Sequence, residues 1–227
     1  MKPRRIRRSL LITPGNRPER LARATASAAD GLVFDIEDGV APADKDSARR
    51  EIAQALAKLE FGRRERIVRI NAMTSAENAA DLAALDWSRI DALFVPKVEA
   101  PEELRRLADR IAAEERRLGR APHIEIIATI ETPRGLLRAL EIADASERTS
   151  ALFFGSGDYT TATGSEVTER TLAVPRALIV AAAAAARIEA IDAAYFTSVR
   201  DVAATRADAA IARELGFAGK LVFHPDQ

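Results

Sequence analysis

The chain has 227 residues, 48% of them hydrophobic and 30% charged, which is typical of a globular protein with one sizeable core. Its 34 basic and 34 acidic side chains cancel, which argues against a general nucleic-acid-binding protein. The lack of cysteine excludes disulfides and thiolate sites, and two histidines are too few for a three-histidine zinc site. No apolar run is long enough for a membrane span or a secretory signal, so we expect a cytoplasmic protein with no membrane partner.

Short β-type runs recur along the chain, with helical stretches between them. The predicted strands are Ser9–Thr13, Leu32–Asp35, Ile67–Asn71, Ala92–Pro96, Ile124–Ile130, Ala151–Gly155, Glu189–Asp192 and Lys220–Phe223. Most are continuously apolar, as expected for parallel strands covered on both faces. Eight alternating units favour a closed (β/α)₈ TIM barrel of the α/β class, spanning 1–227 as a single domain. An open doubly wound sheet is the alternative, because periodicity does not show closure.

The helices between these strands have readable ends. Asp44 is a candidate N-cap for a helix through Lys58, Pro133 starts one over Arg134–Ala143, and Asp201 opens one that Gly216 closes. The chain stops just after its eighth strand, so we expect a barrel that lacks the last C-terminal helix. The apolar stripe left beside the first and last strands would then be covered by another subunit, which predicts a homo-oligomer.

Polar side chains gather where the predicted strands end. They are Asp35, Glu37, Asp38, Arg69, Asn71, Lys97, Glu131, Asp158, Asp192 and His224. Any one of them could be a cap or a solvated charge. Because the carboxyl ends of barrel strands meet at one mouth, their common position predicts a functional site there.

Glu131 and Asp158 are the best metal pair, because they follow adjacent strands and offer the hard oxygen ligands that Mg²⁺ prefers. The alternative is that each caps a turn or helix. Arg69, from the third strand, has the geometry to hold a substrate carboxylate or a developing enolate. Its alternative is a salt bridge to Asp35 or Glu37.

Other signals are weaker. Arg17 and Arg20 at a helix start suit a phosphate, although a solvated helix face explains them equally well. Lys97 and Lys220 are the lysines placed for a Schiff base, but Lys97 is better explained by pairing with the carboxylates around it. His123 begins the fifth strand, at the opposite end from the mouth, which indicates a structural role.

These segments together resemble the citrate lyase β-chain-like family of the hydroxydiacid aldolase superfamily. The matching stretches are Arg8–Gly15, Phe34–Val40 with Lys45 and Arg49, Val68–Asn71, Val95–Glu99, Ile130–Thr132, Gly155–Asp158, and Gly216–Lys220 leading to His224–Gln227. They occur in family order and cover nearly the whole chain.

The resemblance implies a Mg²⁺-dependent barrel, with Mn²⁺ as a possible substitute, that assembles as a homo-oligomer, often a trimer. It implies cleavage or formation of a carbon–carbon bond between a keto acid and an acyl-thioester of coenzyme A or acyl-carrier protein. By position, Glu131 and Asp158 would bind the metal and Arg69 and Glu131 the substrate. Asp38 would join Arg69 and Glu131 in catalysis, Asp35, Glu37, Lys45 and Lys97 would support them, and Arg17 would contact a coenzyme A phosphate.

Relatives continue past the final His-Pro-x-Gln stretch, and in several members that continuation supplies a catalytic aspartate to a neighbouring subunit. We therefore expect slow or absent thioester cleavage by this chain alone. Rapid turnover would contradict this and would direct the search for a base to Asp35, Asp38, Asp192 and His224. Two alternatives to the thioester lyase are a metal-dependent aldolase acting on free hydroxy-keto acids and a non-catalytic metabolite-binding homologue.

Overall fold

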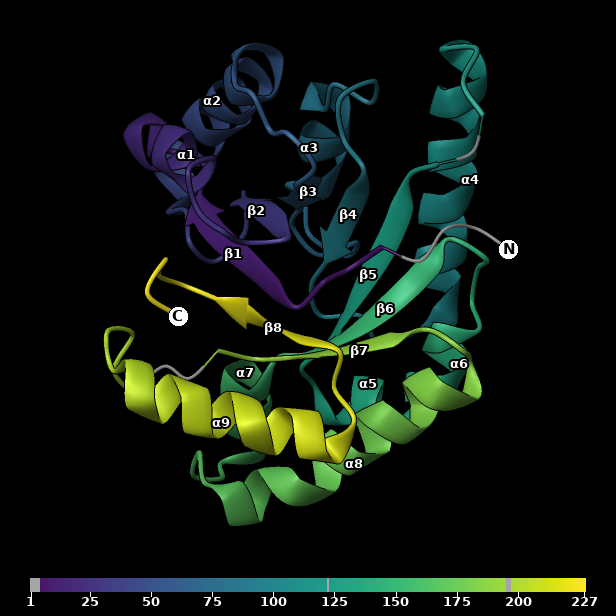
Figure 1. Ribbon diagram of the computed structural model, residues 1–227. Helices are drawn as coiled ribbons and strands as arrows, with labels where there is room; N and C mark the ends of the chain where they lie inside the picture. Colours follow the sequence, from purple (N-terminus) through teal and green to yellow (C-terminus); the bar gives the residue numbers. More distant parts are fainter. Residues whose placement is uncertain (1–4, 122, 195–196) are drawn as a thin grey trace.

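The computed structural model describes residues 5–121, 123–194 and 197–227 (Figure 1). Eight parallel strands close into one barrel in the order β1 to β8, with β8 pairing back onto β1. The strands are β1 Ser9–Pro14, β2 Gly31–Asp35, β3 Glu65–Arg69, β4 Ala92–Val95, β5 Glu125–Ile130, β6 Thr149–Phe154, β7 Glu189–Asp192 and β8 Gly219–Val222. The closed barrel confirms the expected fold and excludes the open sheet.

The helices lie outside the barrel, as Figure 1 shows. They are α1 Pro18–Ala24, α2 Lys45–Lys58, α3 Asn78–Ala84, α4 Pro101–Arg117, α5 Pro133–Leu137, α6 Ala139–Ala143, α7 Ser156–Thr163, α8 Glu169–Ala185 and α9 Val202–Leu215, with a 3-10 turn η1 at Pro42–Asp44. Within the described ranges, none combines the length and apolar character that a membrane crossing requires.

Local chemistry sets most helix boundaries. Asp201 accepts a hydrogen bond from the Ala204 amide, and Gly216 ends α9 at φ +103°, as the sequence predicts. Asp44 does precede α2, but its carboxylate accepts from Asn16 and does not cap the helix. The single helix predicted over Arg134–Ala143 is wrong, because the backbone leaves the helical region at Arg138 and divides it into α5 and α6.

Strand alternation divides the core into two apolar clusters. The side chains inside the barrel include Val33, Ile67, Phe94, Ile127, Phe153, Ile191 and Leu221. The intervening residues point outward and pack beneath the helices in the larger cluster. A side chain near a strand end therefore enters the barrel only if it has the same parity as this inner set.

The amino-terminal end of the barrel is closed by an arginine. Arg7, 3% exposed, donates to both Glu65 oxygens at 2.6 and 2.8 Å, to Glu125 at 2.6 Å and to Ser150 at 2.9 Å. These partners lie in the first two residues of β3, β5 and β6, so one guanidinium ties three strands together. The opposite end is left for the polar residues that follow the strands.

Candidate metal and substrate site

Three strands send a charged side chain into the carboxyl-end mouth of the barrel: Asp35, Arg69 and Glu131. Each lies two or four residues beyond an inward apolar side chain of its strand, Val33, Ile67 or Ile127. Period-two alternation therefore directs all three into the same space, as the sequence predicts.

Arg69 is clamped by carboxylates. Its Nε and Nη2 donate to the two oxygens of Asp35 at 2.6 and 2.7 Å, and its Nη1 lies 3.3 Å from Glu37. The salt bridge that stood as the alternative reading of Arg69 is therefore present. Asp35 is 1% exposed and also accepts from the amides of Glu37 and Gly39, so the guanidinium is held rigidly. Arginine has five N–H donors, so the Asp35 clamp leaves donors for a further acceptor.

Glu131 and Asp158 lie together at the end of β5 and on the first turn of α7. Burial is the main cause and the nearby Asp158 carboxyl the second cause of a raised Glu131 pKa, which is about 8. One Glu131 oxygen accepts from the Lys97 amide at 2.8 Å. A Cβ on Gly155 would lie 2.5 Å from the other oxygen and 2.6 Å from the Glu131 Cβ. Glycine at 155 therefore makes room for Glu131 in this position.

The loop after β2 adds two more carboxylates, held by one ammonium. Lys97 Nζ lies 2.6 Å from Glu37 and 3.0 Å from Asp38. Burial raises the pKa of Glu37 above its usual range. Partial burial opposes ionisation of Asp38, but the hydrogen bond and charge of Lys97, with smaller contributions from Glu37 and Arg69, together keep the Asp38 pKa below its usual range. Asp38 is therefore an ionised group, and its side chain is 59% exposed.

Lys45 and Asn71 support this loop from behind. The Lys45 ammonium donates to the carbonyls of Ile36 and Glu37 at 2.6 and 2.8 Å and to the Asn71 side chain at 2.9 Å. Asn71 in turn donates its backbone and side-chain N–H groups to Asp81 on α3, each at 2.7 Å. Asp81 is fully buried, and sequence reasoning did not single it out. Asp81 lies inside a short helix, and the helix's sequence pattern does not indicate that this side chain binds Asn71.

Asp192 and its strand neighbour do not join the mouth, which corrects the expectation that Asp192 lies there. Asp192 is adjacent to inward-facing Ile191, and Lys220 is adjacent to inward-facing Leu221, so both point outward. Between the barrel and α8, Asp192 accepts from Lys220 at 2.5 Å and from Arg176 at 3.0 and 3.2 Å. Asp192 is 0% exposed, and Lys220 is engaged outside the mouth, so neither is placed for chemistry there.

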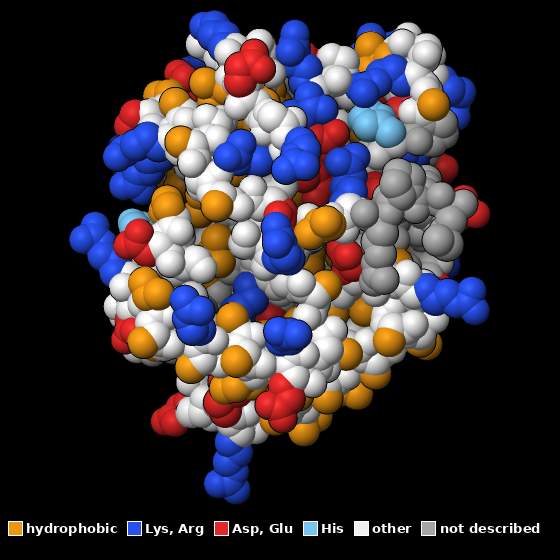
Figure 2. All heavy atoms as spheres, in the orientation of Figure 1, with side chains coloured by type: hydrophobic (Ala, Val, Ile, Leu, Met, Phe, Trp, Pro, Cys, Tyr) orange, Lys and Arg blue, Asp and Glu red, His pale blue; other side chains and the backbone are white. Residues whose placement is uncertain are grey.

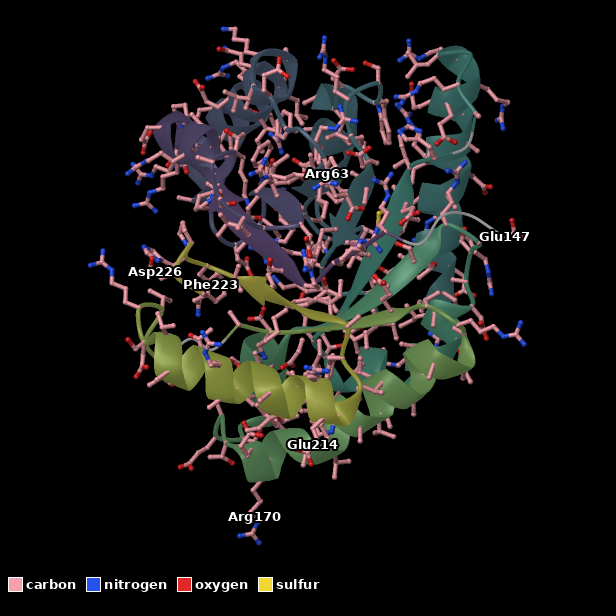
Figure 3. All side chains as sticks on the ribbon, viewed as in Figure 1. Arg63, Glu147, Arg170, Glu214, Phe223 and Asp226 are labelled. Atoms are coloured by element: carbon pink, nitrogen blue, oxygen red, sulfur yellow. The ribbon has the colours of Figure 1, made fainter. Side chains whose placement is uncertain are left out.

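The remaining candidates lie at the edges. His224 follows β8 between Phe223 and Asp226, the residues labelled near the carboxyl end in Figure 3, and it accepts a hydrogen bond from the Asp226 amide. Arg17 is exposed at the start of α1 and is not held by the mouth carboxylates. His123 lies before β5 at the opposite end, where its ring contacts the Ile90 carbonyl at 3.1 Å. Of these, only Arg17 keeps a place in the substrate hypothesis.

The mouth fits a divalent cation. Its five carboxylates, Asp35, Glu37, Asp38, Glu131 and Asp158, outnumber its three basic groups, Arg69, Lys45 and Lys97. Among the residues that the structure describes, no group of three or more His, Cys, Asp or Glu side chains is arranged to hold a metal ion, so a metal here would depend on two protein carboxylates. Two converging carboxylates suit Mg²⁺, which keeps water and substrate oxygens in its remaining positions.

Comparisons with known proteins identify the family to which this barrel belongs. The family model of the HpcH/HpaI aldolase/citrate lyase family matches residues 8–225. The chain belongs to this family. It is 34% identical to citrate lyase subunit beta of Leuconostoc mesenteroides, over 100% of this chain and 76% of that protein. It is also 34% identical to the (3S)-malyl-CoA thioesterase of Cereibacter sphaeroides, over 97% of this chain and 74% of that protein.

Solved structures of family members agree with the fold. The citrate lyase beta subunit of Mycobacterium tuberculosis, complexed with oxaloacetate and magnesium, superposes with a TM-score of 0.81 at 31% identity, covering 98% of this chain and 94% of that one. The CitE protein of the same organism, in complex with magnesium, acetoacetate and coenzyme A, gives 0.80 at 32% identity, covering 98% and 78%. The expected family is thus confirmed, and it is a family of enzymes.

Proposed function

We propose that this protein is a Mg²⁺-dependent carbon–carbon lyase of the citrate lyase β-chain type. Its substrate class is a 2-hydroxyacyl-thioester, such as a citryl-, malyl- or citramalyl-thioester, that is cleaved to or formed from a keto acid and an acyl-thioester. The observation that carries the proposal is the convergence of Glu131 and Asp158 beside the clamped guanidinium of Arg69. Relatives whose complexes contain magnesium with oxaloacetate, or with acetoacetate and coenzyme A, support this class of ligand.

In this proposal Glu131 and Asp158 hold the metal, with Mn²⁺ as an alternative ion. A bound divalent cation acts as a Lewis acid toward a carbonyl or alkoxide oxygen. Arg69 presents the donors that Asp35 leaves free and stabilises negative charge that develops on the substrate. The Asp35 clamp fixes the guanidinium before substrate arrives, so its orientation costs little at the moment of reaction. Arg17, at the rim, contacts a phosphate of the thioester carrier.

The remaining role is the general base that accepts the proton of the substrate hydroxyl. Asp35 and Asp192 are buried in ion pairs, and His224 lies on the segment beyond β8. Asp38 is ionised, exposed and at the mouth, so we assign it the proton of the substrate hydroxyl. Asp38→Asn is expected to lower kcat by about 10²–10⁴-fold, the contribution typical of general base catalysis. Metal binding should stay within a few-fold.

Thioester hydrolysis is a second candidate, favoured by the thioesterase relatives at the same identity. The same mouth would bind the same substrate, but water would attack the thioester carbonyl and the carbon–carbon bond would stay intact. The products separate the two reactions: a lyase releases a keto acid and an acyl-thioester, whereas a thioesterase releases the intact hydroxyacid and free thiol.

The decisive experiment incubates the purified chain with malyl-, citramalyl- and citryl-coenzyme A, with and without Mg²⁺, and identifies products by mass spectrometry. Metal-dependent keto acid release supports the proposal. Activity that survives chelation and is trapped by borohydride would contradict it, because a lysine Schiff base would then be responsible. Acceptance of free hydroxy-keto acids without coenzyme A would favour the aldolase alternative.

We also propose that the working form is a homo-oligomer, with a trimer favoured. The outer face of α8 supports this, because Val174 and Leu178 are 68% and 46% exposed and Leu137 on neighbouring α5 is 83% exposed. Figure 2 shows apolar side chains gathered over the lower right edge of the molecule, where α8 lies in Figure 1. Sedimentation equilibrium tests this proposal, and a stable monomer would contradict it.

A further inference from the structure

Lys97 is one of two described non-glycine residues with a positive φ, and it lies in the mouth. Its φ is +53°, in the left-handed region that an L-residue with a long side chain rarely adopts. It follows Pro96 directly after β4, and the next residue, Val98, still donates its amide to the Thr129 carbonyl on β5 at 3.2 Å. The positive φ is therefore confined to Lys97, between the end of β4 and the anchored Val98. Such outliers persist where the surroundings impose them, often at functional sites.

The turn sends the two polar groups of Lys97 to different parts of the mouth. Its backbone amide donates to Glu131 at 2.8 Å, at the end of β5. Its ammonium lies 2.6 Å from Glu37 and 3.0 Å from Asp38, in the loop after β2. Lys97 thus links Glu37 and Asp38, in the loop after β2, to Glu131 at the end of β5.

We infer that Lys97 is a positioning residue with two separable functions, and this inference rests on the proposed function. The left-handed backbone aims one N–H at Glu131 and leaves its other oxygen for the metal. The ammonium holds Glu37, which also lies 3.3 Å from Arg69, and so it positions the second carboxylate beside the guanidinium that receives the substrate carboxylate. The backbone function governs metal affinity, and the side-chain function governs keto-acid affinity.

A matched pair of variants isolates the backbone function. Lys97→Gly and Lys97→Val both lose the ammonium, but glycine adopts a positive φ freely and a β-branched residue does not. We expect the glycine variant to bind Mn²⁺, followed by electron paramagnetic resonance, within about 3-fold of the wild-type chain. The valine variant should bind at least about 10-fold more weakly, the scale seen when a group that orients a metal ligand is lost. Lys97→Asn, which tolerates the left-handed region, should match glycine, and Lys97→Thr, which is also β-branched, replaces valine if that variant does not fold.

Lys97→Met isolates the side-chain function, with exposed Lys58→Met as the control for loss of one charge. Simple electrostatics predicts that removing a cation from an acidic mouth leaves Mn²⁺ affinity unchanged or tighter. For Lys97→Met we also expect oxaloacetate affinity at saturating Mg²⁺, measured by calorimetry, to fall by about 10-fold, because Glu37 and Arg69 lose their support. In kinetics the change appears in KM more than in kcat.

The outcomes distinguish failure of the proposed function from failure of the two roles inferred for Lys97. A wild-type chain that binds no Mn²⁺ overturns both the proposed function and this inference. A wild-type chain that binds Mn²⁺, with glycine, asparagine and valine variants of equal affinity, overturns the backbone function alone. A methionine variant that binds oxaloacetate as tightly as the wild type overturns the side-chain function.

Discussion

Replacing Gly155 by alanine tests whether the room beside Glu131 matters to the metal site. The added Cβ would lie 2.5 Å from a Glu131 oxygen, whereas real Cβ contacts essentially never fall below 3.0 Å, so the carboxylate must move by at least half an ångström. Metal–ligand distances tolerate only about 0.2 Å. We therefore expect Mn²⁺ affinity to fall by about 10–100-fold, as for other losses of ligand orientation. Overpacking should also lower the free energy of unfolding by about 1–3 kcal/mol.

The control is Gly157→Ala, two residues further along the chain. A Cβ there meets no atom within 4 Å, and alanine favours the helical conformation of α7 by up to about 1 kcal/mol. Gly157→Ala should therefore keep Mn²⁺ affinity and melt at the same temperature or slightly higher. Gly155→Ala should melt about 2–4 °C lower for each kcal/mol lost. Equal Mn²⁺ affinity in the two variants, measured by calorimetry and thermal denaturation, would refute the steric argument.

Three further results are expected. Glu131→Gln and Asp158→Asn should each weaken Mg²⁺ binding by at least about 100-fold in calorimetry, because each removes one of two charged ligands. Retained Mg²⁺ affinity in either variant would contradict the assignment of that residue as a metal ligand. Arg69→Ala should leave metal binding within a few-fold but lower the unfolding free energy in urea by about 3–5 kcal/mol, because Asp35 is left buried without its ion-pair partner. Burial opposes ionisation of Glu115, but Arg148 and the backbone amides of His123 and Ile124 together hold the Glu115 pKa below its usual range. That stabilisation is full above the ordinary glutamate pKa and is lost as pH falls through the lowered value, so Glu115→Gln should flatten the loss of stability between about pH 5 and 3.

The sequence predicts the barrel and most of the mouth because both depend on short-range patterns. Continuously apolar runs identify the strands, and the first polar residue after each run identifies its end. The same reasoning misplaces Asp192, because being near a strand end does not decide which face a residue occupies. Because Ile191 faces the barrel interior, strand alternation predicts that the next residue, Asp192, faces outward.

Other features depend on contacts that no local pattern encodes. The salt bridge between Arg69 and Asp35 joins residues 34 positions apart, and Asp81 reaches Asn71, in the loop after β3, from α3. The left-handed turn at Lys97 has no glycine or asparagine to announce it. Such positions follow from how the strands come together in space, so they are visible only once the barrel is closed.

The pairing of β1 with β8 has a kinetic consequence. Leu10 lies opposite Leu221, so the ring closes through residues at the two ends of the described chain, whereas every other strand pair joins neighbours in sequence. Loop-closure entropy makes such distant pairings slow, and both strands expose unpaired edges until they meet. During refolding, the intermediate with an open seam is therefore the species most prone to aggregate. Substitutions that weaken β8 should show first as lost refolding yield at high protein concentration.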